Sequence, residues 1–226
     1  MGLKHHPRVV TDGLVMYLDA ANPRSYSGSG LTANGLVGGI GGTLVNGVGF
    51  GTTNNGSFIF DGTNDYINIP HSSIITPSDN FSVSFWINQK RAAPGLEVPL
   101  SKYGGADNGW LFVIDNYTMG FDGRNGTNQY QRAASSVPMD LNTWYFFVGI
   151  KNGTSMSIYQ NGSMTGSYTW ATSGVLATTL RDLILGQSNG AYYSNSNISQ
   201  VSMYNKVLTA QEILQNYNAT KKRFGL

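Results

Sequence analysis

The stretch from Phe58 to Pro70 constrains the fold more than any other part of the chain. It reads FIFDGTNDYINIP. The segments Phe58–Phe60 and Tyr66–Ile69 have the apolar or alternating character of strands. The turn Asp61–Asp65 between them is rich in residues that bond their own backbone or accept a positive φ. Pro70 cannot continue a central strand, because proline has no amide hydrogen to donate. The stretch therefore predicts a β-hairpin.

Short segments of the same kind recur along the chain, roughly every ten residues. They cover residues 14–18, 43–45, 81–87, 98–101, 110–114, 117–121, 129–133, 144–151, 156–160, 183–185 and 198–204. Abundant aromatic residues and few Lys and Glu also favour pleated sheet over helix. Many short strands separated by turn signals predict an all-β sandwich.

Individual segments allow more detailed predictions. The longest apolar run, 144–151, predicts a central strand covered on both faces, with Trp86 and Trp144 in the core. Pro99 predicts that 98–101 is an edge strand. Asp115-Asn116 predicts a hairpin between 110–114 and 117–121, and Asn161-Gly162 is the strongest two-residue turn signal.

One helix is predicted over about 209–219. Thr209 and Glu212 have the spacing of a capping box, in which each side chain accepts a hydrogen bond from the other residue's amide. Ile213, Leu214 and Tyr217 give it an apolar stripe. The basic residues Lys221–Arg223 follow the helix. They are interpreted as a solvated helix end, with docking on an acidic partner as the alternative. We expect residues 12–226 to form a single domain, with residues 1–11 as an N-terminal arm.

Composition excludes several classes of function. The chain has no cysteine, so disulfides, thiolate metal sites and cysteine nucleophiles are excluded. A formal net charge of +2 is too small to indicate binding to nucleic acid or to an anionic membrane. No run approaches the roughly 18 apolar residues of a membrane span, and the N-terminal residues lack the apolar core of a secretory signal peptide.

Seven segments, in order along nearly the whole chain, carry a family resemblance. They are 13–26, 58–70, 81–87, 142–153, 157–162, 183–188 and 198–225. In these segments the chain resembles laminin-G-like domains of the concanavalin A-like lectin/glucanase superfamily. The resemblance implies a jelly roll, that is, an all-β, two-sheet antiparallel β-sandwich, here with one short C-terminal helix.

The first and last of these segments resemble one group within the superfamily. The opening LDAANPRSY and the closing LTAQEILQNYNATKKRFG are most similar to the versions found in tailed bacteriophage virion proteins. This implies a virion surface protein, a capsid decoration or fibre domain, with virion proteins as partners and cell-surface glycans as ligands. The alternative is a free-standing or secreted carbohydrate-binding lectin domain that can depend on calcium. Neither interpretation requires a cofactor.

One departure from the family pattern bears on calcium. Ser199-Gln200 stands where the family often has an acidic residue in the last strand, which weakens a calcium site carried over from the family. The turn nevertheless offers up to three side-chain oxygen ligands, from Asp61, Asn64 and Asp65. The competing and favoured interpretation is that Asp61 and Asp65 bond the amides of their own turn.

Three loops carry the chemistry of a glycan site, with aromatic faces beside amides, carboxylates and a guanidinium. Their candidate residues are Tyr103, Asp107, Asn108, Trp110, Asp122, Arg124, Asn125, Tyr192 and Tyr193. The competing interpretation places Trp110 in the core and treats the tyrosines as rim packing.

Catalysis has little support in the sequence. Glu97 and Glu212 are the only glutamates, and no strand carries the pair of acids that a glycosidase needs. His71 is the only histidine outside the N-terminal arm, and no Ser-His-Asp set can be built around it. We therefore expect a non-catalytic binding or structural module.

Overall fold

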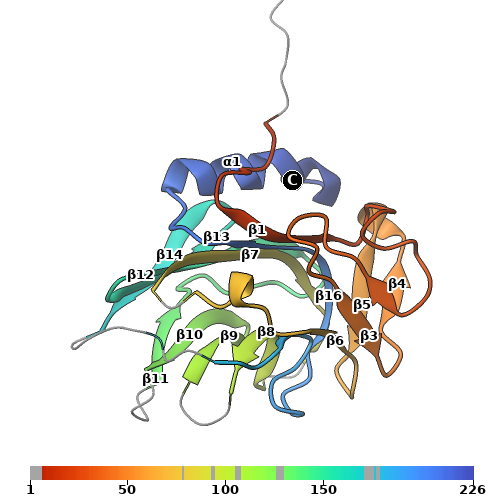
Figure 1. The fold of residues 1–226 in the computed structure, drawn as a ribbon, viewed down its shortest axis with the longest axis horizontal. Helices are drawn as coiled ribbons and strands as arrows, with labels where there is room; N and C mark the ends of the chain where they lie inside the picture. Colours follow the sequence, from red (N-terminus) through yellow and green to blue (C-terminus); the bar gives the residue numbers. More distant parts are fainter. Residues whose placement is uncertain are drawn as a thin grey trace, which may run out of the picture.

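Two antiparallel sheets form the layers of a jelly-roll β-sandwich, and one helix lies over the outer face of one sheet (Figure 1). The structure is a computed structural model, and it describes residues 7–77, 79–92, 95–104, 108–125, 130–170, 176 and 179–226, without the side chains of Asn125 and Tyr130. The predicted fold class is confirmed.

Sheet A is the layer next to the helix. Its strands run in the spatial order β14 (Ser163–Thr169), β13 (Ser155–Gln160), β12 (Trp144–Asn152), β7 (Asn80–Gln89), β16 (Asn195–Tyr204), β5 (Ser57–Asp61) and β4 (Gly49–Gly51), and β1 (Leu14–Asp19) also pairs with β16. The strand β12, predicted to be central, pairs with a strand on each side and is buried along nearly its whole length.

Sheet B forms the opposite layer. Its strands run in the spatial order β11 (Tyr130–Ala134), β10 (Thr118–Asn125), β9 (Asn108–Asp115), β8 (Glu97–Tyr103), β15 (Leu183–Leu185), β6 (Tyr66–Ile69), β3 (Gly42–Val45) and β2 (Thr32–Ala33). The main core lies between the sheets, where Phe81, Phe85 and Phe147 of sheet A meet Phe112 and Phe121 of sheet B. Strands β2, β4 and β14 are absent from the sequence prediction.

The predicted Phe58–Pro70 hairpin is wrong. Strand β5 pairs with β4 and β16 in sheet A, whereas β6 pairs with β3 and β15 in sheet B, so the Asp61–Asp65 turn crosses from one layer to the other. Phe60 and Ile67 are buried in the same core, which they reach from opposite sheets. Alternation indicates which side chains face the core but not which strand is the partner, and the hairpin prediction failed for that reason.

The other local predictions have mixed outcomes. The hairpin between β9 and β10 is confirmed, with Asn116 and Tyr117 at positive φ in its turn, and Asn161-Gly162 joins β13 to β14 as a two-residue turn. The prediction that Pro99 marks an edge strand is wrong, because β8 lies between β9 and β15. Pro99 is accommodated at a register shift between Glu97 and Leu100, where no ladder amide is needed.

The predicted capping box begins helix α1 (Ala210–Thr220), with Thr209 as its N-cap and Glu212 as its partner. Ile213 is buried as predicted, but Leu214 is exposed. The chain continues as the 3-10 helix η3 (Lys221–Phe224). Two more 3-10 helices are η1 (Thr53–Asn55) and η2 (Ser73–Ile75). In the described part of the chain, no helix is long and apolar enough to cross a membrane.

The helix closes the outer face of sheet A through a second apolar cluster. The Phe224 ring stacks on Trp86, with 4.1 Å between ring centroids, and also contacts Trp144. The predicted burial of both tryptophans is therefore confirmed, but in this second cluster rather than between the sheets. Val10 joins the cluster, and its amide donates to Asn216 Oδ1 of α1 over 2.7 Å.

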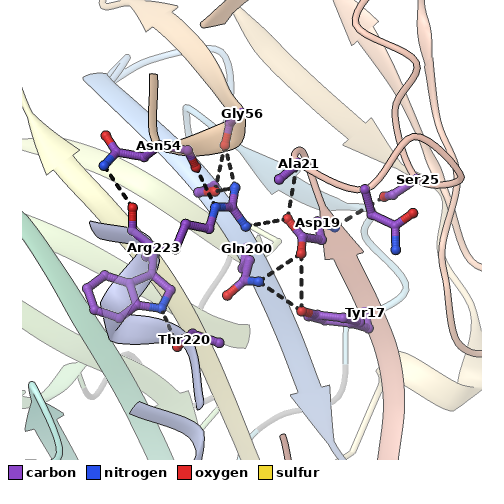
Figure 2. Close-up of polar contacts among 12 residues, drawn as sticks. Tyr17, Asp19, Ala21, Ser25, Asn54, Gly56, Gln200, Thr220 and Arg223 are labelled. Carbon is purple, nitrogen blue, oxygen red and sulfur yellow. Dashed lines mark hydrogen bonds and ion pairs between the residues drawn. The ribbon is translucent and has the colours of Figure 1, made fainter. Parts of the chain in front are cut away.

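Arg223 departs from the predicted solvated helix end. Its guanidinium reaches across to β1 and η1, where it forms an ion pair with Asp19 (Nη1–Oδ1 2.7 Å) and donates to the Asn54 and Gly56 carbonyls (Figure 2). Asp19 also accepts from Gln200, over 2.8 Å. The C-terminal segment is thus held to β1 and to the η1 region, both distant in sequence. The sequence could not predict this ion pair, because a run of basic residues has the same pattern whether its side chains are solvated or paired with a distant carboxylate.

We predict that Arg223→Met destabilises the protein by about 3 kcal/mol, because it leaves the largely buried Asp19 carboxylate without its counter-charge. The neighbouring Lys222 is exposed, so Lys222→Met should change the free energy of unfolding by less than about 0.5 kcal/mol. Urea unfolding monitored by circular dichroism measures both. Equal effects from the two substitutions would contradict the assigned role of Arg223.

Candidate functional site

A hollow of about 500 Å³ lies on the outer face of sheet B, and we call it the Tyr192 groove. Its volume is within the range of small-molecule sites in proteins. It is lined by Leu96, Val98, Tyr103, Leu111, Val113, Asp122, Arg124, Arg132, Ser188, Asn189 and Tyr192. The groove brings together four residues that the sequence nominated for ligand binding, Tyr103, Asp122, Arg124 and Tyr192.

The floor of the groove is apolar because β9 carries apolar residues on both faces. Leu111 and Val113 line the groove, while Trp110 and Phe112 alternate with them and face the core. The Trp110 side chain is only 2% exposed and packs against Phe81 and Phe121. Its nomination as a ligand residue is therefore wrong, and the competing core interpretation holds.

Charged groups form one wall of the groove. Arg132 of β11 binds Asp122 of β10 with both ends of its guanidinium, over 2.9 Å and 3.2 Å. The same guanidinium reaches Asp115 over 3.1 Å. Asp122 is 1% exposed, so its charge is balanced by Arg132 within the wall. The Arg124 guanidinium lies over the Tyr103 ring, 5.7 Å from its centroid.

A tight turn after β15 positions the opposite wall. The Ser188 amide donates to the Ala191 carbonyl, and Asn189 and Gly190 have positive φ between them. The Tyr192 carbonyl accepts from the Val98 amide over 2.8 Å, which fixes this segment beside β8. The Tyr192 side chain itself is 54% exposed. A backbone held at both ends thus presents an accessible aromatic ring over an apolar floor.

A second hollow of about 380 Å³, the Asp182 hollow, adjoins the first, and Tyr103 and Asn189 line both. Its other lining residues are Asn68, Ser101, Leu180, Arg181, Asp182, Ile184 and Gln187. Asp182 accepts from the Asn68 amide group over 2.9 Å and from the His71 backbone amide over 2.8 Å. The outer face of sheet B therefore has two adjacent hollows, and each is lined by both polar and apolar residues.

The remaining candidates lie elsewhere. Tyr193 is outside the lining of both hollows, and its carbonyl accepts from Arg91. Asn108 Oδ1 is buried beside Gly104. Asp107 and the side chain of Asn125 fall outside the described residues.

Sequence reasoning missed the floor and one wall, namely Leu111, Val113, Val98 and Arg132. A signal for the floor exists in the run Trp110–Ile114, which is apolar without interruption. In an antiparallel sheet such a run indicates that the outer face is also apolar, so its outer side chains mark a covered or binding surface. Nothing comparable points to Arg132, whose position depends on the pairing of β10 with β11.

Comparison of sequences places the chain in a family. The family model described as the concanavalin A-like lectin/glucanases superfamily matches residues 61–214, more than half of the chain. The chain belongs to this superfamily. No protein with a curated description matches it by sequence.

Among the solved structures that this chain resembles are binding domains of clostridial toxins. The binding domain of Paraclostridial Mosquitocidal Protein 1 has a TM-score of 0.76 at 15% identity, over 92% of this chain and 52% of the other. The botulinum neurotoxin serotype D ligand binding domain in complex with N-acetylneuraminic acid has a TM-score of 0.74 at 17% identity, over 91% and 50%. The binding domain of botulinum neurotoxin DC in complex with SialylT has a TM-score of 0.73 at 16% identity, over 92% and 52%.

The chain spans about half the length of each of these toxin domains. At such identities the likeness establishes the fold and nothing more. It gives no support to the phage virion context.

In this chain, the carboxylates of the Asp61–Asp65 turn accept hydrogen bonds from backbone amides of the same turn. Asp61 Oδ1 accepts from the Thr63 amide over 2.7 Å, and Asp65 Oδ2 accepts from the Asp61 amide over 3.3 Å. Burial and the nearby Asp61 charge raise the pKa of the Asp65 carboxyl. Among the described residues, no three His, Asp or Glu side chains gather as a metal site would require. Calcium at Asp61, Asn64 and Asp65 stays a prediction.

Two substitutions separate the turn interpretation from the calcium interpretation. We expect Asp61→Ala to lower the free energy of unfolding by about 1 kcal/mol, with or without calcium, because it removes the bond to the Thr63 amide. Asn64 is exposed, so Asn64→Ala should have little effect. Thermal unfolding in calcium chloride and in chelator measures both. A calcium-dependent gain in Tm that either substitution abolishes would establish the metal site instead.

Both glutamates have structural roles. Glu97 is fully buried, where it pairs with Arg91 (Oε1–Nε 3.0 Å) and accepts from the Asn195 amide over 2.8 Å. Burial nevertheless raises the pKa of the Glu97 carboxyl. Glu212 is the partner in the α1 capping box. Neither residue lines the Tyr192 groove or the Asp182 hollow.

A buried lysine lies close to the Asp182 hollow. Lys102 is almost fully buried, and its ammonium donates to the Arg181 carbonyl over 2.5 Å. Burial lowers the pKa of Lys102 to about 8, although the Asp182 charge opposes the shift.

Lys102 predicts a pH dependence with a definite sign. Between the folded pKa of about 8 and the reference value of 10.5, the unfolded chain binds more protons at this residue, so stability rises with pH. Lys102→Met removes the titration. We therefore expect urea unfolding to show wild type gaining stability relative to this variant between pH 7.5 and pH 10. A difference that stays constant with pH would contradict the buried ammonium.

Proposed function

We propose that the chain is a non-catalytic glycan-binding module, and that its binding surface is the outer face of sheet B. One observation carries this proposal. The Tyr192 groove combines an accessible aromatic ring, an apolar floor and a charged wall in a hollow of about 500 Å³.

This combination suits a sugar because pyranose rings have apolar C–H faces and polar edges. An exposed ring such as Tyr192 packs against a C–H face, and Leu111 and Val113 extend the apolar contact. Arg124 and Asn189 border the same hollow and offer donors and acceptors to the hydroxyl edge. The adjoining Asp182 hollow continues the surface, so an oligosaccharide of more than one residue can extend across Tyr103.

The comparisons support the proposal at a coarse level. The similar toxin structures are binding domains, and two of them are complexes, one with N-acetylneuraminic acid and one with SialylT. Because this chain spans only about half of those domains, their ligands indicate a class of molecule and no particular subsite.

Attachment to a larger assembly, a virion or a fibre, is a second part of the proposal. The segment that contains Val10 and the C-terminal residues lie on the α1 side of the sandwich, whereas sheet B is the opposite layer (Figure 1). A carrier that contacts the α1 side would leave the Tyr192 groove free to meet a cell surface. If the carrier is a virus particle, the protein should co-purify with particles in a fixed copy number.

A glycan array tests the binding proposal directly. We expect the wild-type chain to bind a defined group of glycans and Tyr192→Ala to weaken that binding at least tenfold, about 1.4 kcal/mol. Tyr168 on β14 is also partly exposed but belongs to sheet A, so Tyr168→Ala is the matched control and should bind normally.

Two results would contradict the proposal. The first is an array without binding, both in calcium and in chelator. The second is binding that Tyr192→Ala and Tyr168→Ala leave equally intact, which would place the glycan outside the Tyr192 groove.

A further inference from the structure

A third hollow, of about 260 Å³, lies on the outer face of sheet A, and we call it the amide hollow. It is lined by Asn54, Asn88, Lys90, Asn142, Trp144 and Asn197, with the hydroxyls of Thr53 and Ser57 at its side. It shares no residue with the two hollows of sheet B.

The strand register places an indole and two amides in one row across the sheet. Asn88 of β7 lies opposite Trp144 of β12 on one side and opposite Asn197 of β16 on the other. Ile87 and Ile198, the neighbours in sequence, face the main core, so Asn88 and Asn197 face outward. An indole and two amides on three neighbouring strands therefore converge on one small space.

Asn88 lacks the hydrogen bond that a buried amide requires. The residue is only 4% exposed, and its Oδ1 has no hydrogen-bond partner. A buried polar atom without a partner costs about 1–3 kcal/mol. Such atoms are few in folded proteins, and each one calls for a specific explanation. This observation distinguishes the amide hollow from an ordinary polar depression.

The charge of the hollow indicates which ligand it suits. The Lys90 ammonium donates to Asn142 Oδ1, a neutral acceptor, over 3.1 Å, and no carboxylate occurs among the described residues of the lining. Burial lowers the pKa of Lys90, as expected for an ammonium without a nearby counter-charge. A ligand with one negative charge and several hydroxyls would pair with Lys90 and satisfy the amides together.

The wall of the hollow is held rigidly. Asn54 has a left-handed backbone (φ 56°), and its Oδ1 accepts from Trp144 Nε1 over 3.1 Å. Its Nδ2 donates to the Arg223 carbonyl over 2.9 Å (Figure 2). A wall fixed in advance lowers the entropy that ligand binding must overcome.

We propose that the amide hollow is a second ligand site that binds one carboxylate-bearing sugar unit, of the hexuronic acid class. Lys90 binds the carboxylate, and the amides of Asn88 and Asn197 bind the ring hydroxyls. The site is independent of the Tyr192 groove, so the chain can contact a glycan surface from both sheets.

Glucuronate and glucose are the probes, because they differ only in the carboxylate at C6. Titration of the full chain by calorimetry should give saturable glucuronate binding, with glucose at least tenfold weaker. Trp144 lines the hollow while Trp86, Trp110 and Trp170 are buried elsewhere, so glucuronate should also change the tryptophan fluorescence. Trp144→Phe should remove that change.

Substitutions locate the site. Lys90→Gln should weaken glucuronate binding at least tenfold. Lys222→Gln, at an exposed position of η3, and Tyr192→Ala, in the sheet B groove, should leave it unchanged. The proposal is overturned if glucuronate does not saturate, if glucose binds as tightly, or if Lys90→Gln has no effect. Loss of binding in Tyr192→Ala would also overturn it, by assigning glucuronate to the groove.

Discussion

Two contacts hold the C-terminal segment over the outer face of sheet A. They are the stacking of Phe224 on Trp86 and the ion pair of Arg223 with Asp19. Sheet A carries large apolar side chains on its outer face, among them Phe146 and Val148, and these would be exposed without the C-terminal segment. Burial of apolar surface of this size dominates the energetics of folding. The C-terminal segment therefore completes a second apolar core, which would otherwise be exposed to solvent.

Because the C-terminal segment covers sheet A, the outer faces of the two sheets differ in how much of them is exposed to solvent. Over sheet B no helix lies in the described structure, and the outward residues of β8 and β9 remain to line hollows. The few polar groups there are held by pairs such as Arg132 with Asp122, so the surface is ordered before any ligand arrives. Sheet A is not covered along its whole outer face, and the amide hollow lies on it beside Asn54 and Lys90. Both proposed sites thus lie on parts of the sheets that the helix leaves open.

The sequence was informative where the deciding interaction is local. Alternation located most strands, the Thr209–Glu212 spacing located the helix start, and Asn161-Gly162 located a tight turn. It failed where the partner is distant. The Asp61–Asp65 turn crosses between sheets, Pro99 lies at a bulge in an interior strand, and Arg223 binds Asp19 of β1. Four nominated residues line the Tyr192 groove, namely Tyr103, Asp122, Arg124 and Tyr192. Its floor at Leu111 was not predicted, because it depends on which face of β9 points outward.

A soluble paramagnetic probe, added to protein with labelled methyl groups, measures the solvent accessibility of the two outer faces by NMR line broadening. It is the most direct test of whether the C-terminal segment covers sheet A. We expect strong broadening of the Leu96 and Leu111 methyl signals, which lie on the open face of sheet B, and little broadening of Val148 and Ile150, which belong to the apolar cluster covered by the C-terminal segment. Broadening of Val148 and Ile150 as strong as that of Leu111 would contradict it, because the C-terminal segment would then not cover sheet A.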